Sequence, residues 1–176
     1  MTKKDILKRI EELFYEKSFK EVSMQNIANE IGMKKASLYH HFSSKDILIK
    51  DVLDESFLCY LNFIKDIITQ WKDDNFQDLL QSFLDFWENQ KNIFSIINQN
   101  WYVENETILA HIREHQKVIF DTIDEIMHKK ANFTSEKTFL FLTLINQIGR
   151  KNNIYNACEI DKNRIWMEIE NLFFKN

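Results

Sequence analysis

Proline is absent from this 176-residue chain, and glycine occurs only twice. Because proline and glycine are the residues that most often interrupt helices, almost nothing in the sequence breaks helical structure. Apolar residues recur at helical spacing nearly everywhere along the chain. The sequence therefore predicts an all-α fold of about nine helices and no strand.

Cysteine is also scarce, with only Cys59 and Cys158 in the chain and no C-x-x-C motif. This usage is typical of reduced thiols in a cytoplasmic protein. No run of about 18 apolar residues is present, so we predict no membrane span. The first ten residues, "MTKKDILKRI", show no apolar core of a signal peptide. We expect a cytoplasmic protein with no membrane partner.

Motifs of common enzyme classes are missing. The sequence shows no glycine-rich phosphate loop, Ser-His-Asp order, paired-carboxylate motif or cysteine-nucleophile signature, and we predict neither an enzyme nor a cofactor. Catalysis by scattered residues and a helical adaptor without a DNA target stay open as alternatives. Salt-dependent binding to a short DNA duplex would separate a DNA-binding protein from both.

Charge is unevenly distributed. The chain has a formal net charge of -4, which argues against non-specific adhesion to nucleic acid or membranes by the whole molecule. Residues 1–50, however, hold ten Lys and Arg against seven Asp and Glu, whereas the remainder is acidic. A basic end on an acidic body indicates two functions in one chain.

The basic end contains a helix-turn-helix pattern between Ser23 and Lys45. Ser23 is a good N-cap for a first helix, and Gly32 suits a left-handed stop after it. A short second helix follows, with Leu38 and Phe42 as its apolar residues. In such a unit the second helix enters the major groove of DNA.

The side chains of this second helix suit a nucleic acid. Lys34 and Lys35 lie at its start, where free backbone N–H groups favour a phosphate. The groups that could reach base edges or the sugar-phosphate backbone are Ser37, Tyr39 and His40, with His41 and Lys45 extending the basic edge. Spacing alone would also permit a solvated basic helix.

The segment "LFYEKSFKEVSMQNIANEIGMKKASLYHHFSSKDIL", residues 13–48, resembles the N-terminal signature of TetR-family transcriptional regulators. The matching features are Leu-Phe, a later Phe, Ser-Met, Ile-Ala, Gly, Leu-Tyr-x-x-Phe and Ser-Lys-x-x-Leu. Carried over by position, the resemblance implies DNA contacts by Ser23, Lys34, Lys35, Ser37, Tyr39, His40, His41 and Lys45. Many members have Ser or Thr in place of Lys34, Gly in place of Ala36 and Tyr in place of His40, so the preferred bases stay open.

The resemblance also implies the organisation and partners of the chain. Residues 1–46 would form the DNA-binding domain, and residues 47–176 the ligand-binding and dimerisation domain. The family's proteins are homodimers that bind a palindromic operator in double-stranded DNA, commonly as repressors released by a small-molecule effector. The effector, the operator sequence, the regulated genes and the choice between repressor and activator are not determined by this sequence.

The acidic body is predicted to contain long helices. Ser44 can cap a helix from about Lys45 to Trp71, and another begins at Asp74 or Asn75. Further helices are expected at 106–130, 135–150 and 161–174. The last two are rich in apolar residues, so they either close the domain core or pack against a second copy as a four-helix bundle.

A ligand cavity in this body would be lined by aromatic residues and one histidine. The predicted ligand-binding residues are Trp71, Phe83, Phe86, Trp87, Trp101 and His115. Aromatic residues at helical spacing are also typical of plain core packing. His115 lies four residues after His111, but "HIREH" lacks the glutamate of a zinc-hydrolase helix. We therefore favour a hydrogen-bonded histidine pair and predict no metal site, with contact to an organic ligand or a metal as alternatives.

Overall fold

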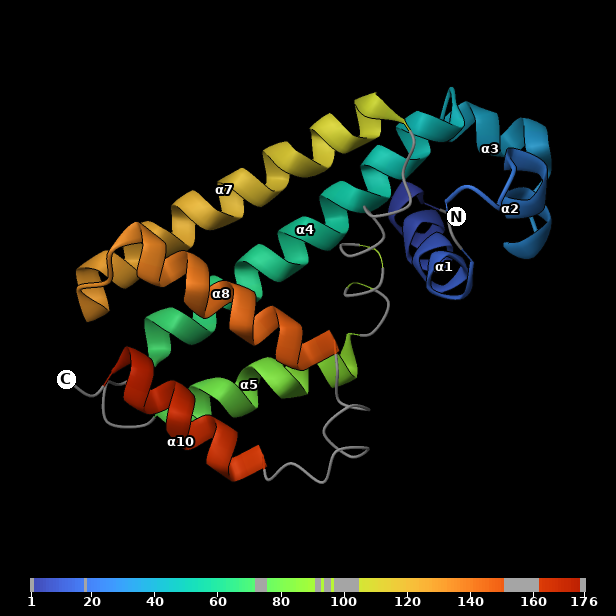
Figure 1. Cartoon of the computed structure of the whole chain (residues 1–176). Coiled ribbons are helices and arrows are strands. Elements are labelled where there is room, and N and C mark those ends of the chain that lie inside the picture. The colour runs from blue at the N-terminus through green and yellow to red at the C-terminus, as the bar shows by residue number, and fades with distance from the viewer. Residues whose placement is uncertain are drawn as a thin grey trace. The chain divides into compact units, whose positions relative to one another are not determined.

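The computed structural model describes residues 2–17, 19–71, 76–90, 93, 96, 105–150 and 162–174. Within these ranges the chain forms helices and no strand, which confirms the predicted all-α class (Figure 1). In the described part of the chain, the helices with defined bounds are α1 (Lys3–Glu16), α2 (Met24–Glu30), α3 (Lys35–His41), α4 (Lys45–Gln70), α5 (Phe76–Asn89), α7 (Glu106–Ala131), α8 (Ser135–Arg150) and α10 (Lys162–Phe173).

Local side-chain caps fix where the N-terminal helices begin. The side chains of Thr2 and Ser23 each accept a hydrogen bond from the backbone N–H three residues later. In return, the side chains of Asp5 and Asn26 accept a hydrogen bond from the backbone N–H of Thr2 and Ser23, respectively. Helices α1 and α2 therefore both start with a capping box. Ser44 Oγ accepts from the Ile47 N–H at 3.2 Å. These caps satisfy N–H groups that have no partner inside the helix, and they confirm Ser23 and Ser44 as helix starts.

Left-handed residues end two of the helices. Gly32, after α2, has a φ of 70°, as the sequence predicts. Asn132, after α7, has a φ of 52°, and sequence reasoning missed this stop. Asparagine is the residue other than glycine that most readily adopts this conformation, because its short polar side chain can hydrogen-bond locally.

The chain divides into two compact units. The first comprises Met1–Asn62 and Gln90–Lys117, and thus contains α1, α2, α3, the first part of α4 and the start of α7. Its core is apolar and includes the fully buried Ile6, Ile10, Phe14, Ile27, Ala28, Leu38, Phe42, Leu48, Val52 and Leu53. Burial of this face holds α3 and the start of α4 against α1 and α2.

The second unit comprises Phe63–Asn89 and Val118–Asn176. Its core contains an aromatic cluster in which the Phe133 ring lies 6.0 Å from the rings of both Phe141 and Phe173. Lys130 Nζ donates to the carbonyl oxygens of Ile68 and Thr69 at 2.8 and 2.7 Å, so the cation caps the C-terminal end of α4.

The boundary between the compact units falls inside α4, between Asn62 and Phe63. The sequence predicts a different boundary, at 46/47, between the DNA-binding domain and the ligand-binding and dimerisation domain. This functional boundary stays a prediction. No helix within the described ranges is both long enough and apolar enough to cross a membrane.

Candidate nucleic-acid interface

The turn between α2 and α3 is held by backbone hydrogen bonds. The Met33 N–H donates to the Ala28 carbonyl at 2.8 Å, and the Gly32 N–H donates to the Asn29 carbonyl at 3.2 Å. Together with the positive φ of Gly32, these contacts form a Schellman-type helix end. Arg9 of α1 donates to the Ile31 carbonyl at 3.0 Å, which further fixes the C-terminus of α2. The turn that orients α3 is therefore defined by the first unit itself.

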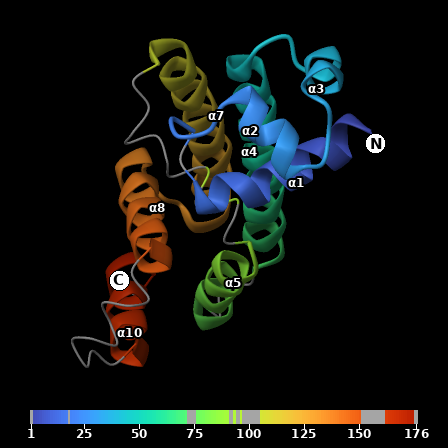
Figure 2. The same ribbon diagram turned by 90° about the vertical axis from the view of Figure 1, so that its right-hand side faces the viewer.

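Helix α3 lies beside α2 in the first unit (Figure 2). It has one buried and one exposed face. Leu38 and the following Phe42 are fully buried and attach the helix to the core of the first unit. The remaining predicted DNA-contacting side chains of this segment are more accessible, with Lys35, Ser37, Tyr39, His40 and His41 all outside the buried core. These side chains are thus accessible on a helix whose opposite face is buried, as a helix that enters the major groove of DNA requires.

Two lysines at the edges of this face have structured surroundings. Lys35 Nζ lies 5.9 Å from the centre of the Tyr39 ring, a cation–π distance that orders both side chains. Burial lowers the pKa of the half-buried Lys45 ammonium, and the nearby Asp46 carboxylate partly offsets this effect. The negative charge of a DNA phosphate beside Lys45 would stabilise the charged form of its ammonium group.

Ser23 also belongs to this unit, but its hydroxyl already has a structural role. Its Oγ accepts from the Asn26 N–H at 3.1 Å at the start of α2. The N-terminus of a helix favours an anion, so the position remains suited to a phosphate. Whether Ser23 and the residues of α3 contact DNA stays a prediction.

The predicted ligand-binding residues divide between the two units. Trp71, Phe83, Phe86 and Trp87 belong to the second unit and are buried. The Phe86 ring stacks on Phe63 at 3.9 Å and meets the Trp87 ring edge-on at 4.9 Å. His115 belongs to the first unit, and Trp101 lies outside the described residues. Their contact with a ligand stays a prediction.

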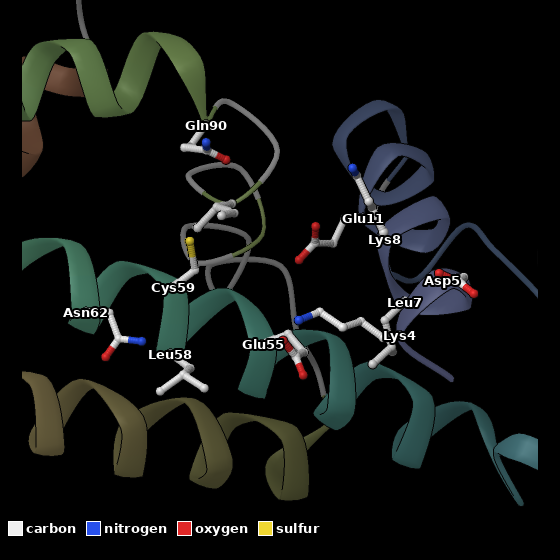
Figure 3. A pocket seen from close by; sticks show the side chains of 11 residues that line it. Lys4, Asp5, Leu7, Lys8, Glu11, Glu55, Leu58, Cys59, Asn62 and Gln90 are labelled. Carbon is white, nitrogen blue, oxygen red and sulfur yellow. The ribbon is translucent and has the colours of Figure 1, made fainter. Parts of the chain in front are cut away.

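A pocket of about 520 Å³ lies in the first unit between α1 and α4 (Figure 3). Lys4, Lys8 and Glu11 approach it from α1, and Glu55 and Cys59 approach it from α4. Burial raises the pKa of the Glu11 carboxyl, and burial together with the two nearby glutamates raises the pKa of the Cys59 thiol. Of the predicted ligand-binding residues that the structure describes, none lines this pocket.

Sequence reasoning missed Asp54, which lies beside both His111 and His115. Asp54 is 57 and 61 residues from these histidines, and no motif connects them. In the sequence Asp54 stands between Leu53 and Glu55 on a long predicted helix, and nothing in this pattern indicates a partner.

Comparison with known proteins gives a match to a segment that lies within the first unit. A family model described as bacterial regulatory proteins, tetR family, matches residues 6–52. IcaR of Staphylococcus aureus (strain Newman), a negative transcriptional regulator of the biofilm operon icaADBC, is 36% identical over 74 residues, which are 41% of this chain and 38% of IcaR. FasR of Mycolicibacterium smegmatis, a transcriptional activator, is 24% identical over 129 residues, which are 72% of this chain and 58% of FasR.

The chain thus spans less than two thirds of the length of these curated relatives. Similarity to a solved structure extends over the whole fold: the crystal structure of AibR with isovaleryl coenzyme A and operator DNA aligns with a TM-score of 0.71 at 17% identity, covering 98% of both chains. The two curated relatives are transcriptional regulators, in agreement with the expectation that the chain is not an enzyme. Residues 6–52 thus match the DNA-binding part of the tetR family of bacterial regulatory proteins, and the chain shares the all-helical fold of the AibR structure.

Proposed function

We propose that this protein is a ligand-responsive regulator that binds a palindromic operator as a homodimer, as a repressor released by a small-molecule effector. Residues 1–46 would bind DNA, and residues 47–176 would bind the effector and the second copy. The observation that carries the proposal is the exposed basic and aromatic face of α3 above the buried Leu38 and Phe42. Such a regulator would act on chromosomal DNA in the cytoplasm.

Dimerisation follows from the small size of the DNA-binding segment. One α3 helix offers few base contacts, so a two-fold dimer reading half-sites about 34–36 Å apart is the natural arrangement. The second unit supports it, because α8 exposes Phe139, Leu140 and Leu144 and α10 exposes Met167 and Leu172. A second copy that covers these side chains would remove them from water.

Effector response would use α4. This helix runs without interruption for 26 residues from the end of the DNA-binding segment, and its sequence contains neither glycine nor proline. It therefore lacks the usual causes of a kink. The aromatic residues beside its later part, Phe83, Phe86 and Trp87, would border the effector. An effector can change DNA affinity only by binding one arrangement of the protein more tightly than the other.

The first experiment tests DNA binding. Selection of bound sequences from random DNA should yield a palindrome, and the combined variant Lys34→Ala, Lys35→Ala, Lys45→Ala should lose affinity for it. The dependence of log affinity on log salt should become shallower by about one for each phosphate that is no longer neutralised. Lys129→Ala is the matched control, because Lys129 is an exposed lysine of α7 paired with Glu125. Unchanged affinity in the triple variant would refute DNA binding by this face.

The second experiment tests effector release. Since AibR was crystallised with isovaleryl coenzyme A, short-chain acyl-coenzyme A thioesters are the first compounds to titrate, with and without operator DNA. A coupling free energy of about 1–3 kcal/mol would lower operator affinity roughly 5- to 150-fold, and operator would weaken the effector by the same factor. Equal affinity in both titrations would exclude that compound as an effector.

A further inference from the structure

Asp54, His111 and His115 converge on one point in the first unit. Asp54 lies on α4, and the two histidines lie one turn apart on α7. Asp54 Oδ1 is 2.7 Å from His111 Nε2 and 2.6 Å from His115 Nε2. The two Nε2 atoms are themselves 3.3 Å apart. Three atoms that can each bind a metal therefore face one another.

The separation of the two histidine nitrogens fits a shared cation. Two nitrogens bound to zinc at about 2.0–2.1 Å with tetrahedral angles lie about 3.3–3.4 Å apart, and the observed value is 3.3 Å. The carboxylate oxygen would have to withdraw from the nitrogens by about 0.6 Å to reach the same geometry. Asp54 has room for this movement, since its side chain is 47% exposed.

We propose that Asp54, His111 and His115 form a binding site for a divalent transition-metal ion of the Zn²⁺ class. Two imidazoles and one carboxylate suit zinc, iron, cobalt or nickel, whereas Mg²⁺ and Ca²⁺ prefer oxygen ligands alone. Three protein ligands leave at least one coordination position open. The His111 and His115 side chains are 20% and 27% exposed, so water or a small ligand can reach that position.

The surroundings hold the histidines in place for this role. The Phe57 ring stacks on the His115 ring at 4.8 Å between centres and 10° between planes, which fixes the orientation of the imidazole. Ile108 and Ile112 on the same helix are buried and anchor this part of α7. Ligands whose orientation is fixed before binding lose little freedom when the ion arrives.

The proposed ion would join two helices of the first unit. Asn105 Nδ2 already donates to Asp46 Oδ2 at 2.9 Å, which connects the segments at the starts of α4 and α7. A metal at Asp54 would connect the same helices about two turns further along. Because α4 follows directly after α3, occupancy would stabilise the unit that carries the DNA-binding face. Glu114, which precedes His115, is not placed as the general base of a zinc hydrolase, so the role assigned is binding and not hydrolysis.

The test uses the full chain after removal of any purification tag and treatment with a chelator, and it needs no DNA. Its result is therefore independent of the proposed function. Titration with Zn²⁺, and with Co²⁺ as a coloured substitute, should show one ion bound per chain, and Mg²⁺ should not compete. Asp54→Asn and His111→Ala should each weaken Zn²⁺ binding at least tenfold. His128→Gln and Asp66→Asn, on the same two helices, are the matched controls and should bind as the wild type does.

Two measurements on the wild type guard against variants that fail to fold. At a hundredfold excess over Kd, Zn²⁺ should raise the thermal midpoint by about 5–10 °C. It should also protect His111 and His115, but not His128, from acylation of their rings as read by mass spectrometry. Absence of saturable Zn²⁺ binding, tight binding by a folded Asp54→Asn variant, or an equal affinity for Mg²⁺ would overturn the proposal.

Discussion

At the scale of single residues, Gly32 is required by its backbone conformation and not by crowding. Its φ is 70°, and a Cβ added to it would meet no heavy atom within 4 Å. Any penalty for a side chain therefore comes from the left-handed backbone alone, since no clash adds to it. For residues other than glycine this conformation costs roughly 1–2 kcal/mol.

We predict that Gly32→Ala lowers the free energy of unfolding by about 1 kcal/mol, because the smaller entropy of the unfolded alanine chain offsets part of the strain. Gly32→Asn should lose less, since asparagine tolerates the left-handed region. Urea denaturation of both variants measures the difference. An asparagine variant less stable than the alanine variant would contradict this explanation of the turn.

The half-buried Glu11 is a second residue whose environment sets its chemistry. Burial raises the pKa of its carboxyl, with the Glu55 carboxylate adding to the effect and a hydrogen bond from Ser56 Oγ at 3.2 Å opposing it. The folded state thus binds this proton more tightly than the unfolded state. Stability from Glu11 is greatest when the carboxyl is protonated and falls as the pH rises from 4.5 through the higher pKa of the folded state.

We predict that Glu11→Gln is more stable than the wild type near pH 7, because the amide keeps an acceptor for Ser56 without a buried charge. The difference should shrink as the pH falls through the higher pKa of the folded state towards 4.5, the ordinary value for the carboxyl. Denaturation of both proteins at several pH values measures this change. A Glu11→Gln variant that is less stable at pH 7 would disprove the assignment.

At the scale of secondary-structure elements, α2 has only seven residues and depends on its capping box. Ser23 Oγ accepts from the Asn26 N–H, and the Ser23 N–H donates to Asn26 Oδ1 at 3.1 Å. A helix this short gains little from its own propensity. The same serine is a predicted DNA contact, so its two roles have to be separated.

Two substitutions separate them. Ser23→Ala should lower the free energy of unfolding by about 1 kcal/mol because the cap is removed. Ser23→Asp should keep the cap, and so nearly the wild-type stability, but weaken operator binding because its carboxylate repels a phosphate. Denaturation measures the free energy of unfolding, and DNA binding at several salt concentrations measures the affinity for the operator. If Ser23→Asp binds operator as tightly as the wild type, no phosphate lies beside this residue.

At the scale of the whole molecule, the exposed apolar side chains of α8 and α10 form the interface that we propose for a dimer. Phe139 and Leu144 of α8 have exposed fractions of 59% and 37%, whereas Phe141 and Ile145 of the same helix are buried. Leu172 of α10 is 71% exposed. Exposed apolar groups concentrated on two elements of one unit are typical of a protein interface.

We predict that the double variant Phe139→Ser, Leu144→Ser sediments as a monomer at micromolar concentration, where the wild type sediments as a dimer. Operator affinity should fall with it, because one α3 helix would then bind alone. The control is Val118→Ser, which alters an exposed apolar residue of α7. A wild type that sediments as a monomer, or a double variant that remains dimeric, would refute this interface.

Local sequence determined most elements of this protein. The caps at Thr2, Ser23 and Ser44 and the left-handed Gly32 act within four residues, so signals of this kind can be identified before any fold is known. The exposed face of α3 could be predicted for the same reason. Its residues occupy one short continuous segment, and the period of a helix is enough to separate the buried Leu38 and Phe42 from the exposed side chains around them.

Only the tertiary structure decided which helices meet. Periodicity tells which face of a helix is buried but not which partner covers it or at what register. The approach of Asp54 to His111 and His115, and the position of Glu11 opposite Ser56, depend on helices that are far apart in the sequence. These contacts arise because the apolar faces of α1, α4 and α7 bury one another, and the polar groups between them take whatever partners that packing provides.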